Sequence, residues 1–334
     1  MGKQWTAEEV LGTVRAFQPA CVIIAAAELD VFTVLKDGPT GAADLAGRTG
    51  ADVRGMTVLL DALAAMELLI KRDRRYEVPP TVADVLAEGG SRCGLAGVRH
   101  LGNCLRRWAQ LGNVVKTGRP AEREPSVRGQ AGDTEAFIRA MHEFSGPVGE
   151  GLVKALGPLC FKHLLDVGGG SGTWTIAFLR LVPQADATIF DLPEVIPMAA
   201  RRMEEAGLAG RVRLVGGDFG KDGLPGGADL AWLSAIVHQN SRQENRALFA
   251  KVFSALAAGG RILIRDVVMD ETRTRPPMGA LFAVNMLVGT PGGGTFTLNE
   301  LRDDLQAAGF ADVKLLRRGE AMDSVVGAIK PIGP

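Results

Sequence analysis

The sequence predicts an α/β protein in which a doubly wound, mostly parallel sheet follows a helical first half. Three observations predict this fold class. Beyond residue 150, apolar segments of strand length alternate with segments of helical length, an order typical of parallel sheets. One of these strands, 163–167, runs directly into a glycine-rich turn at 168–172 that opens a helix. Before residue 150, apolar residues recur instead at helical spacing.

The first half divides into helical segments and one hairpin. In chain order these are an apolar-periodic stretch interrupted by Pro19 (8–35), two short helices (41–47 and 52–69), a hairpin (71–78), a loop rich in proline and charge (118–132) and a connecting helix (134–156). Short helices followed by a hairpin give a winged-helix outline. The change of pattern predicts a first domain at 1–150 and a second at 151–334, which suits the length of the chain.

The second half contains the strands of the predicted sheet. We expect them at 163–167, 187–191, 211–215, 228–237, 261–268, 312–317 and 324–329, with helices that include 174–182 and 298–308. The last two strands are joined by a short turn, so they should be antiparallel to each other. The earlier strands end on one rim, where open α/β sheets bind their ligands.

The glycine-rich turn favours one kind of ligand. A turn without side chains lets a ligand approach the backbone, and the following helix offers free N–H groups. A dinucleotide fingerprint needs a third glycine where this chain has Thr173, although Gly168 and Gly170 supply the first two. Asp166, just before the turn, would repel a pyrophosphate but suits a positive amine. S-adenosylmethionine, which has an ammonium, a sulfonium and no phosphate, fits this loop best.

Two further acids end the next two strands. Asp191 lies about 20 positions after Gly170, which places it to accept hydrogen bonds from ribose hydroxyls. Asp218 is followed by Phe219, and this pair could bind adenine through the carboxylate and the ring. Any one of these acids could be a solvated turn residue. Three acids at successive strand ends on one rim predict a cofactor site.

Composition excludes several classes of function. Lys plus Arg equals Asp plus Glu at 38 each, so the chain has no net charge with which to attract nucleic acid or an anionic membrane. The four cysteines are scattered, without the spacing of a zinc site or a disulfide framework. The apolar run 20–27 is too short to span a bilayer. We therefore expect a cytoplasmic protein that holds no metal and binds neither nucleic acid nor membrane.

The winged-helix outline invites a DNA-binding interpretation, which the charges oppose. The helix at 52–69 would be the recognition helix, but Asp52, Arg54, Asp61 and Glu67 leave it slightly acidic. Phosphate contacts need Lys and Arg. Its apolar surfaces are better suited to bury against a second copy of the chain, which predicts a homodimer. A winged-helix regulator that senses the cofactor is the alternative from a different class.

A candidate general base follows the fourth strand. His238 lies directly after the segment 228–237, beside the predicted cofactor rim. A neutral imidazole there could take the proton of a phenol, whose pKa near 10 keeps it protonated at neutral pH. Asp266 ends the fifth strand on the same rim and could orient that imidazole. Alternatively, Arg265 could pair with Asp266 and make the acid purely structural.

These residues resemble a known family, the S-adenosylmethionine-dependent small-molecule O-methyltransferases of the plant caffeate and acetylserotonin type and their bacterial relatives. The resemblance covers nearly the whole chain. It implies a Rossmann-like seven-stranded methyltransferase sheet, a winged-helix-like N-terminal dimerisation domain and methyl transfer to a hydroxyl of a small, aromatic acceptor. Residues 166–172 are similar to the family's cofactor loop, 190–193 to its ribose-binding strand end and 217–219 to its adenine contact.

The resemblance also assigns the catalytic and acceptor residues. His238 falls where the family has its catalytic base, and Asp266 where it has one of two flanking acids. Trp108, Met141 and Met286 lie where relatives line the acceptor pocket; from the residues alone they would be core side chains.

Several positions depart from the family's pattern. Relatives follow the catalytic His with Asp and Trp, where this chain has Gln239 and Asn240, and the second flanking acid falls on Thr295. Ser234, at the cofactor site, replaces a Lys that is often found four residues before the His. His238 therefore has at most one carboxylate partner. A family member that binds the cofactor but catalyses a non-methylating reaction remains the alternative.

Overall fold

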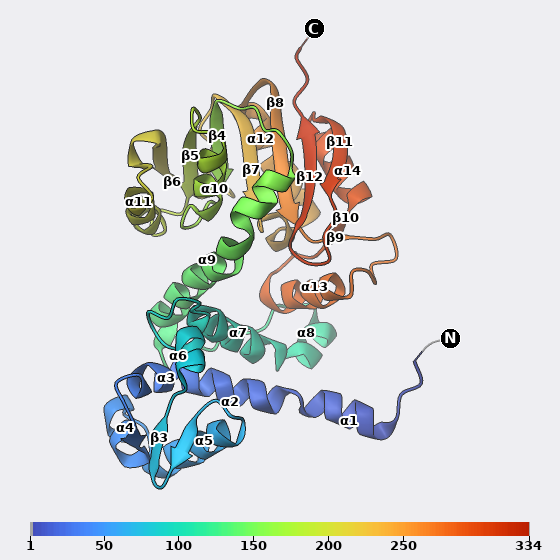
Figure 1. Ribbon diagram of the computed structural model, residues 1–334. Coiled ribbons are helices and arrows are strands. Elements are labelled where there is room, and N and C mark those ends of the chain that lie inside the picture. The colour runs from blue at the N-terminus through green and yellow to red at the C-terminus, as the bar shows by residue number, and fades with distance from the viewer. Residues whose placement is uncertain (1–2, 334) are drawn as a thin grey trace. The chain divides into compact units, whose positions relative to one another are not determined.

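The computed structural model describes residues 3–333 and divides them into two compact units (Figure 1). The first unit runs to Arg106 and includes Arg123–Glu143; the second comprises Arg107–Glu122 and everything from Phe144 onward. The long helix α9 (Gly129–Ala155) contributes its first part to one unit and its second part to the other. The two units are therefore interleaved along the chain.

The first unit is helical with one small antiparallel sheet. Its elements are α1 (Ala7–Arg15), α2 (Phe17–Glu28), α3 (Val31–Leu35), β1 (Thr40–Gly41), α4 (Ala42–Thr49), α5 (Val53–Ala65), β2 (Ile70–Arg72), β3 (Arg75–Glu77), α6 (Pro80–Leu86) and α7 (Leu95–Trp108). The predicted hairpin is present as β2 and β3, and β1 adds a third strand beside β3. Its core packs around Phe32, Leu45, Leu60 and Tyr76, all buried.

The first helical stretch breaks at a different residue from the one that the sequence indicated. The interruption lies at Ala16, and Pro19 sits in the first turn of α2. Proline is tolerated there because the N–H groups of a first turn have no partner within the helix. The helices α6 and α7 were not predicted, since α6 has only seven residues and the glycine and arginine residues of α7 weaken its apolar periodicity.

The stretch Ala7–Glu28 is long and apolar enough to cross a membrane by length and composition, which corrects the shorter estimate from the run 20–27. Helices of globular proteins can meet the same criterion. No residue of α1 is buried, and Val10, Val14 and Phe17 are among the exposed large apolar side chains. Residues 7–28 thus present an uncovered apolar face.

The second unit contains a seven-stranded sheet in the order β11-β12-β8-β7-β4-β5-β6. Its strands are β4 (His163–Val167), β5 (Asp186–Asp191), β6 (Val212–Gly216), β7 (Ala228–Ser234), β8 (Leu256–Asp266), β11 (Ala311–Arg317) and β12 (Ser324–Ile329). Five strands are parallel, and β12 is antiparallel to both of its neighbours, β8 and β11. The predicted doubly wound α/β class and the antiparallel final pair are confirmed.

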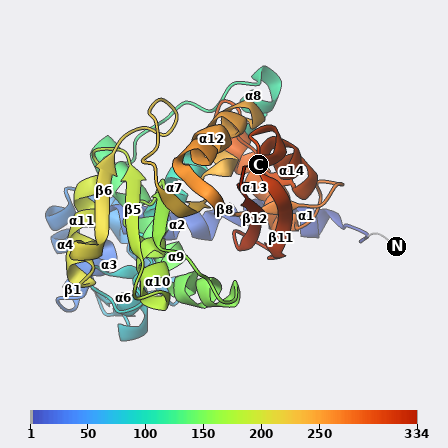
Figure 2. The same cartoon turned by 90° about the horizontal axis from the view of Figure 1, so that it is seen from above.

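Helices cover both faces of this sheet (Figure 2). On one face α10 (Thr173–Leu181), α11 (Ile196–Glu205) and the end of α9 pack around Trp174, Phe178 and Trp232. On the other face α12 (Arg242–Ala255) and α14 (Leu298–Ala307) pack around Phe249 and Leu305. Burial on both faces explains why the central strands are almost continuously apolar.

The remaining elements of the second unit are short or were not predicted. They are α8 (Leu111–Thr117), the 3₁₀ turns Ala209–Arg211 and Val237–Gln239, the small parallel pair β9 (Val268–Met269) and β10 (Phe296–Thr297), and the helix α13 (Pro277–Gly289). The strand expected at 228–237 ends earlier, at Ser234, so His238 lies on a 3₁₀ turn rather than at a strand end. The change of direction follows Ala235, which has a left-handed backbone with φ of 59°.

Candidate active site

The glycine-rich turn after β4 has a backbone that side chains would not allow. Gly168 and Gly172 have φ of 67° and 76°, and a Cβ on either would lie 2.4 Å from the side chain of Ile236 or Met203 respectively. Gly170 also has a positive φ, of 56°, but a Cβ there would meet nothing within 4 Å. The turn is therefore closely packed beneath and open above Gly170, which suits a ligand lying against its backbone.

Asp166 lies under this turn and is almost completely buried. Its Oδ2 accepts a hydrogen bond of 2.7 Å from Oγ1 of Thr175, in the first turn of α10. Burial raises the pKa of Asp166 to about 7, and the nearby Asp191 raises it further against the effect of Thr175. A buried carboxyl of this kind favours a cationic partner, because a positive charge offsets the cost of ionising it.

Asp191 is fixed by backbone groups on both sides. Its Oδ2 accepts the N–H of Gly170 at 2.6 Å, and its Oδ1 accepts the N–H of Leu192 at 2.7 Å. Burial raises its pKa, while these two hydrogen bonds oppose the shift. The carboxylate at the end of β5 is thus held directly beside the open part of the glycine turn.

Asp218 and Phe219 follow β6. Oδ1 of Asp218 accepts the N–H of Gly220 at 2.8 Å, and the hydrogen bond from Lys221 lowers its pKa, so this carboxylate stays ionised. The ring of Phe219 approaches the glycine turn: its Cε1 would be 3.7 Å from a Cβ on Gly168. The structure therefore brings together the two loops that the sequence assigned to one cofactor.

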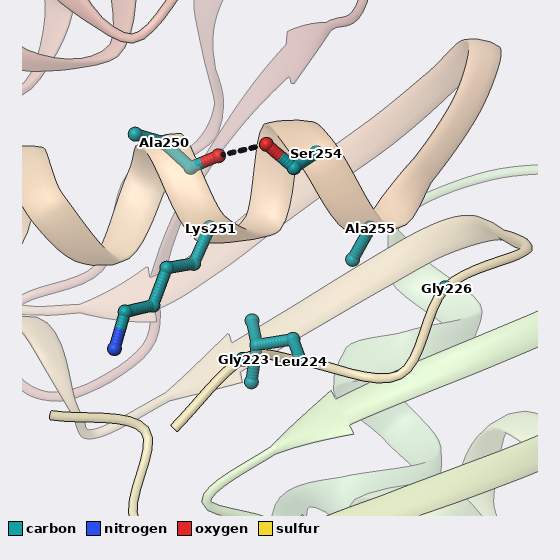
Figure 3. A pocket seen from close by; sticks show the side chains of 7 residues that line it. All are labelled: Gly223, Leu224, Gly226, Ala250, Lys251, Ser254 and Ala255. Atoms are coloured by element: carbon teal, nitrogen blue, oxygen red, sulfur yellow. Dashed lines mark hydrogen bonds between the residues drawn. The ribbon is translucent and has the colours of Figure 1, made fainter. Parts of the chain in front are cut away.

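The helix α12 supports both this loop and the turn that carries His238. Nζ of Lys251 donates to the backbone oxygen of Phe219 at 2.7 Å. Two turns earlier, Nδ2 of the buried Asn245 donates to the backbone oxygen of Val237 at 2.9 Å. Lys251 also lines a mainly apolar pocket between α12 and the segment 223–226 (Figure 3). That pocket contains no other ionisable group, so it offers no catalytic chemistry of its own.

His238 and Asp266 form a buried pair. Nδ1 of His238 lies 2.9 Å from Oδ1 and 3.0 Å from Oδ2 of Asp266, and the backbone N–H of His238 donates to Oδ2 at 3.2 Å. Each side chain is at least nine-tenths buried. A carboxylate at Nδ1 holds the proton on that nitrogen and leaves Nε2 to accept one. The pair can therefore act as an oriented general base.

The structure decides between the two partners that the sequence left open for Asp266. Arg265 points to the opposite face of the sheet, where its Nη1 donates to Oγ of Ser234 at 3.0 Å and its guanidinium lies 4.6 Å from the ring centre of Trp174. Asp266 pairs with His238. In the sequence, only the alternation of side chains along β8 separates these two neighbouring residues.

Phe282, on α13, is a residue of the candidate site that the sequence did not predict. Its ring meets the imidazole of His238 edge to face, with ring centres 4.8 Å apart and planes at 87°. One turn further along, Oδ1 of Asn285 accepts the indole N–H of Trp108 at 2.9 Å, and Met286 is buried. Trp108 thus contacts the helix that carries Phe282 and Met286, and the assignment of Trp108 and Met286 to the acceptor site stays a prediction. Met141 belongs to the first unit, and its assignment stays a prediction.

The positions that depart from the family's pattern add no second acid. Nε2 of Gln239 donates to the backbone oxygen of Ala235, and Nδ2 of Asn240 donates to Asn245. Thr295 is buried, and its backbone oxygen accepts a hydrogen bond from Arg273. Across residues 3–333, no group of three or more His, Cys, Asp or Glu side chains is placed to hold a metal.

The fold and this rim define a class of protein. A doubly wound sheet with a glycine turn, acids after adjacent strands and an oriented imidazole is typical of an enzyme that binds a nucleoside-containing cofactor. Sequence models of two domains match the chain: an O-methyltransferase domain over residues 113–311 and an O-methyltransferase dimerisation domain over residues 13–89. The chain belongs to the S-adenosylmethionine-dependent O-methyltransferase family.

Individual relatives agree over most of the chain. A 3-hydroxy-5-methyl-1-naphthoate 3-O-methyltransferase from Streptomyces sahachiroi is 31% identical and covers 92% of this chain and 91% of its own. A tetracenomycin polyketide synthesis 8-O-methyl transferase from Streptomyces glaucescens is 32% identical, with 92% of each chain covered. The solved structure of human N-acetylserotonin methyltransferase with S-adenosylmethionine superposes with a TM-score of 0.79 at 26% identity, covering 99% of this chain and 100% of that one.

These matches confirm the predicted family, fold class, enzyme activity and cofactor. They leave the regulator alternative without support, because the chain has the catalytic domain as well as the dimerisation domain.

Proposed function

We propose that this enzyme transfers a methyl group from S-adenosylmethionine to a phenolic hydroxyl of a small aromatic acceptor, with His238 as the general base. The observation that carries the proposal is the buried pair of Nδ1 of His238 with both oxygens of Asp266. A base oriented in this way matches the main chemical need of the reaction, since a phenol is mostly protonated at neutral pH.

The residues around the glycine turn fit the cofactor. The open space above Gly170 leaves room for the cofactor to lie against the backbone of the turn. The buried carboxyl of Asp166 suits the ammonium of the cofactor, and the carboxylate of Asp191 suits its ribose hydroxyls. Asp218 and Phe219 would take the adenine through the carboxylate and the ring. When bound, S-adenosylmethionine supplies an electrophilic methyl group on its sulfonium.

The protein's own residues then handle the proton. Nε2 of His238 accepts the proton of the acceptor hydroxyl, and the carboxylate of Asp266 stabilises the imidazolium that forms. Phe282 packs against the imidazole and holds the ring in place. Among the described residues, Asp266 is the acid that contacts the imidazole, and the side chains of Gln239, Asn240 and Thr295 carry no charge that could share this role.

The acceptor we propose is a hydroxylated fused-ring aromatic compound. The two bacterial relatives are named for a naphthoate and for a tetracenomycin polyketide. In this chain Trp108 and Met286 offer flat and adaptable apolar surface close to the helix that carries Phe282.

The test is to incubate the purified enzyme and S-adenosylmethionine with a panel of hydroxynaphthoates and larger fused-ring phenols, and to search for products heavier by one methylene unit with mass spectrometry. The matching methyl ethers, which have no hydroxyl proton, serve as controls. Methylation of at least one phenol and of no ether is expected. Cofactor binding without methylation of any phenol would contradict the proposal and favour the non-methylating alternative. Thr295, in place of the second flanking acid, is the feature of the chain that agrees with that alternative.

We propose a homodimer formed through the first unit. The dimerisation domain covers residues 13–89, and α1 and α2 expose an apolar face to which a second copy of the chain is the fitting partner. We also propose action in the cytoplasm, because none of the four cysteines forms a disulfide in residues 3–333, as expected in a reducing compartment. Fractionation of the native cells with an antibody to the protein tests the location.

A further inference from the structure

Arg265 is a buried cation without an anionic partner. Only 6% of the residue is exposed. Its Nη1 donates to the neutral hydroxyl of Ser234, its flat face lies over Trp174, and its Nε has no hydrogen-bond partner among the residues described. No carboxylate of residues 3–333 forms an ion pair with it. Removing a guanidinium from water without pairing it with an anion is costly.

The two acids whose charges act on Arg265 are engaged elsewhere. Asp266 points to the other face and binds His238, and the carboxylate of Asp323 pairs with Arg317 at 3.2 Å. Burial lowers the pKa of Arg265 to about 10, which still leaves the side chain charged at neutral pH. The guanidinium of Arg265 is therefore charged and has no anionic partner among the described residues.

Strand register places Arg265 on the same face as Asp166. Asp166 lies beside Trp232, and Ser234, two residues further along β7, lies beside Arg265. In parallel strands such neighbours point to the same side. Asp166 and Arg265 thus flank β7 on the face that carries the start of α10, about 12 Å apart at the backbone, since two strand spacings and an offset of two residues separate them. Both side chains contact α10, since Asp166 accepts a hydrogen bond from Thr175 and Arg265 lies over Trp174.

A second donor in this place also lacks an acceptor. Nε1 of Trp232 is buried and has no hydrogen-bond partner in the described part of the chain. Trp232 and Arg265 both contact Trp174, the second residue of α10. The region thus holds unpaired donors next to a positive charge, on the rim where the glycine turn opens. An anionic group of a ligand would satisfy it.

We propose that Arg265 binds the carboxylate of the methionine part of S-adenosylmethionine, with Ser234 holding the guanidinium and Asp166 taking the adjacent ammonium. The inference rests on the proposed function. The methionine part carries one cationic and one anionic group on the same carbon, and Asp166 and Arg265 supply the complementary charges. The carboxylate is the only anionic group of the cofactor. Relatives often have Lys at the position of Ser234. In this chain the cation comes instead from Arg265, on the neighbouring strand, which donates to Ser234.

The experiment compares S-adenosylmethionine with its decarboxylated form, which keeps the ammonium, sulfonium and nucleoside but lacks the carboxylate. Calorimetry should show that the wild-type enzyme binds the complete cofactor about 10- to 100-fold more tightly, the range for a charge-assisted hydrogen bond. Arg265→Gln should lose that preference while its affinity for the decarboxylated form stays unchanged. Arg261→Gln, at the exposed other end of β8, is the matched control and should keep the preference.

Equal affinity of the wild-type enzyme for both compounds overturns the inference and leaves the proposed function intact. Equal losses for both compounds in Arg265→Gln also overturn it, because they indicate a purely structural role. If Arg265→Gln does not fold, Ser234→Ala provides the second variant: it keeps the charge, and a loss confined to the complete cofactor supports the inference. Failure of the wild-type enzyme to bind either compound overturns the proposed function as well.

Discussion

Asp266 offers both of its carboxylate oxygens to Nδ1 of His238, at 2.9 and 3.0 Å, and one of them also accepts the backbone N–H of His238. The acid therefore fixes the position of the residue and the orientation of the ring at the same time. Since both side chains are buried, little solvent screens this interaction.

Replacement of the proposed base should reduce turnover without weakening the binding of the cofactor. His238→Ala is expected to lower kcat by about 10²–10⁴-fold, the usual contribution of general-base catalysis. Raising the pH toward the pKa of the acceptor should restore part of the rate, because phenolate then forms unaided. Rate measurements across pH and calorimetry with S-adenosylhomocysteine test this.

His163→Ala is the matched control, since His163 lies at the opposite end of β4 and bonds to Thr188. It should leave kcat nearly unchanged. Methyl transfer at close to the normal rate by His238→Ala would show that deprotonation does not depend on this residue.

Asp266→Asn should reduce kcat by less than His238→Ala does. The amide can still contact Nδ1, but it carries no charge to stabilise the imidazolium, and it can donate to Nδ1 and so favour the wrong tautomer. The exposed Asp186→Asn is the control. A larger loss in Asp266→Asn than in His238→Ala, in a folded protein, would contradict an orienting role.

Affinity for S-adenosylhomocysteine should depend on pH through Asp166. Burial raises its pKa to about 7 in the free enzyme, so below that pH the carboxyl is protonated and must release its proton to receive the ligand's ammonium. Affinity should therefore rise as the pH increases toward 7 and level off above it. Calorimetry in buffers of different ionisation enthalpy measures the released proton. Asp166→Asn should bind weakly and independently of pH in this range.

The same group gives an independent stability measurement with a defined sign. The pKa of Asp166 is higher in the folded protein than the ordinary value of 3.8, so the folded state binds the proton more tightly than the unfolded state. The contribution of Asp166 to stability is therefore greatest below pH 3.8 and falls as the pH rises to about 7, by about 4 kcal/mol at most. Relative to wild type, the Tm of Asp166→Asn should improve over this range; a constant difference would rule out the linkage.

Asp191→Ala should lower the affinity of the enzyme for S-adenosylhomocysteine by about 10- to 100-fold, because a charge-assisted hydrogen bond to the ribose is lost. The substitution also frees the N–H of Gly170, which Asp191 now accepts. Asp186→Ala, at the exposed beginning of the same strand, should bind normally. Unchanged affinity of Asp191→Ala, or tighter binding of NAD than of S-adenosylhomocysteine, would exclude this carboxylate as the ribose ligand.

The dimer should depend on the apolar face of α1. Val14, which is 62% exposed, lies in the middle of that face, and Val14→Glu would place a charge in the buried interface. Light scattering should report a dimer for the wild-type enzyme and a shift toward monomer for this variant. Val127→Glu, at an equally open loop position, should remain dimeric. A monomeric wild-type enzyme at micromolar concentration would refute the proposed assembly.

The sequence predicted the parallel strands and their rim because strand ends carry local signals. Asp191 ends β5 and Asp266 ends β8 where apolar runs stop, and the structure places both there. The 3₁₀ turn that carries His238 was not predicted, because the left-handed backbone at Ala235 has no signature in an alanine. Pro19 was misleading for a related reason: proline marks a helix interruption only outside the first turn.

Contacts between distant segments could not be read from the sequence. The apolar pattern of α13 does not reveal that Phe282 meets His238 or that Asn285 receives the indole of Trp108, since these pairs depend on how the chain returns to the rim. The partner of Asp266 required the register of β7 and β8, which turns Arg265 to the other face. The residue types thus indicated the chemistry of the site, and the register of the strands decided which side chains contact each other there.

The helix α12 has a consequence for how such an enzyme can change its acceptor. One end of this helix is tied to the turn of His238 through Asn245, and Lys251, six residues later, is tied to the loop of Phe219. Six helical residues span about 9 Å, so α12 sets a fixed distance between the loop of Phe219 and the turn of His238. Substitutions in α13 can then change which acceptor binds, while α12 keeps the distance between the loop of Phe219 and the turn of His238 unchanged.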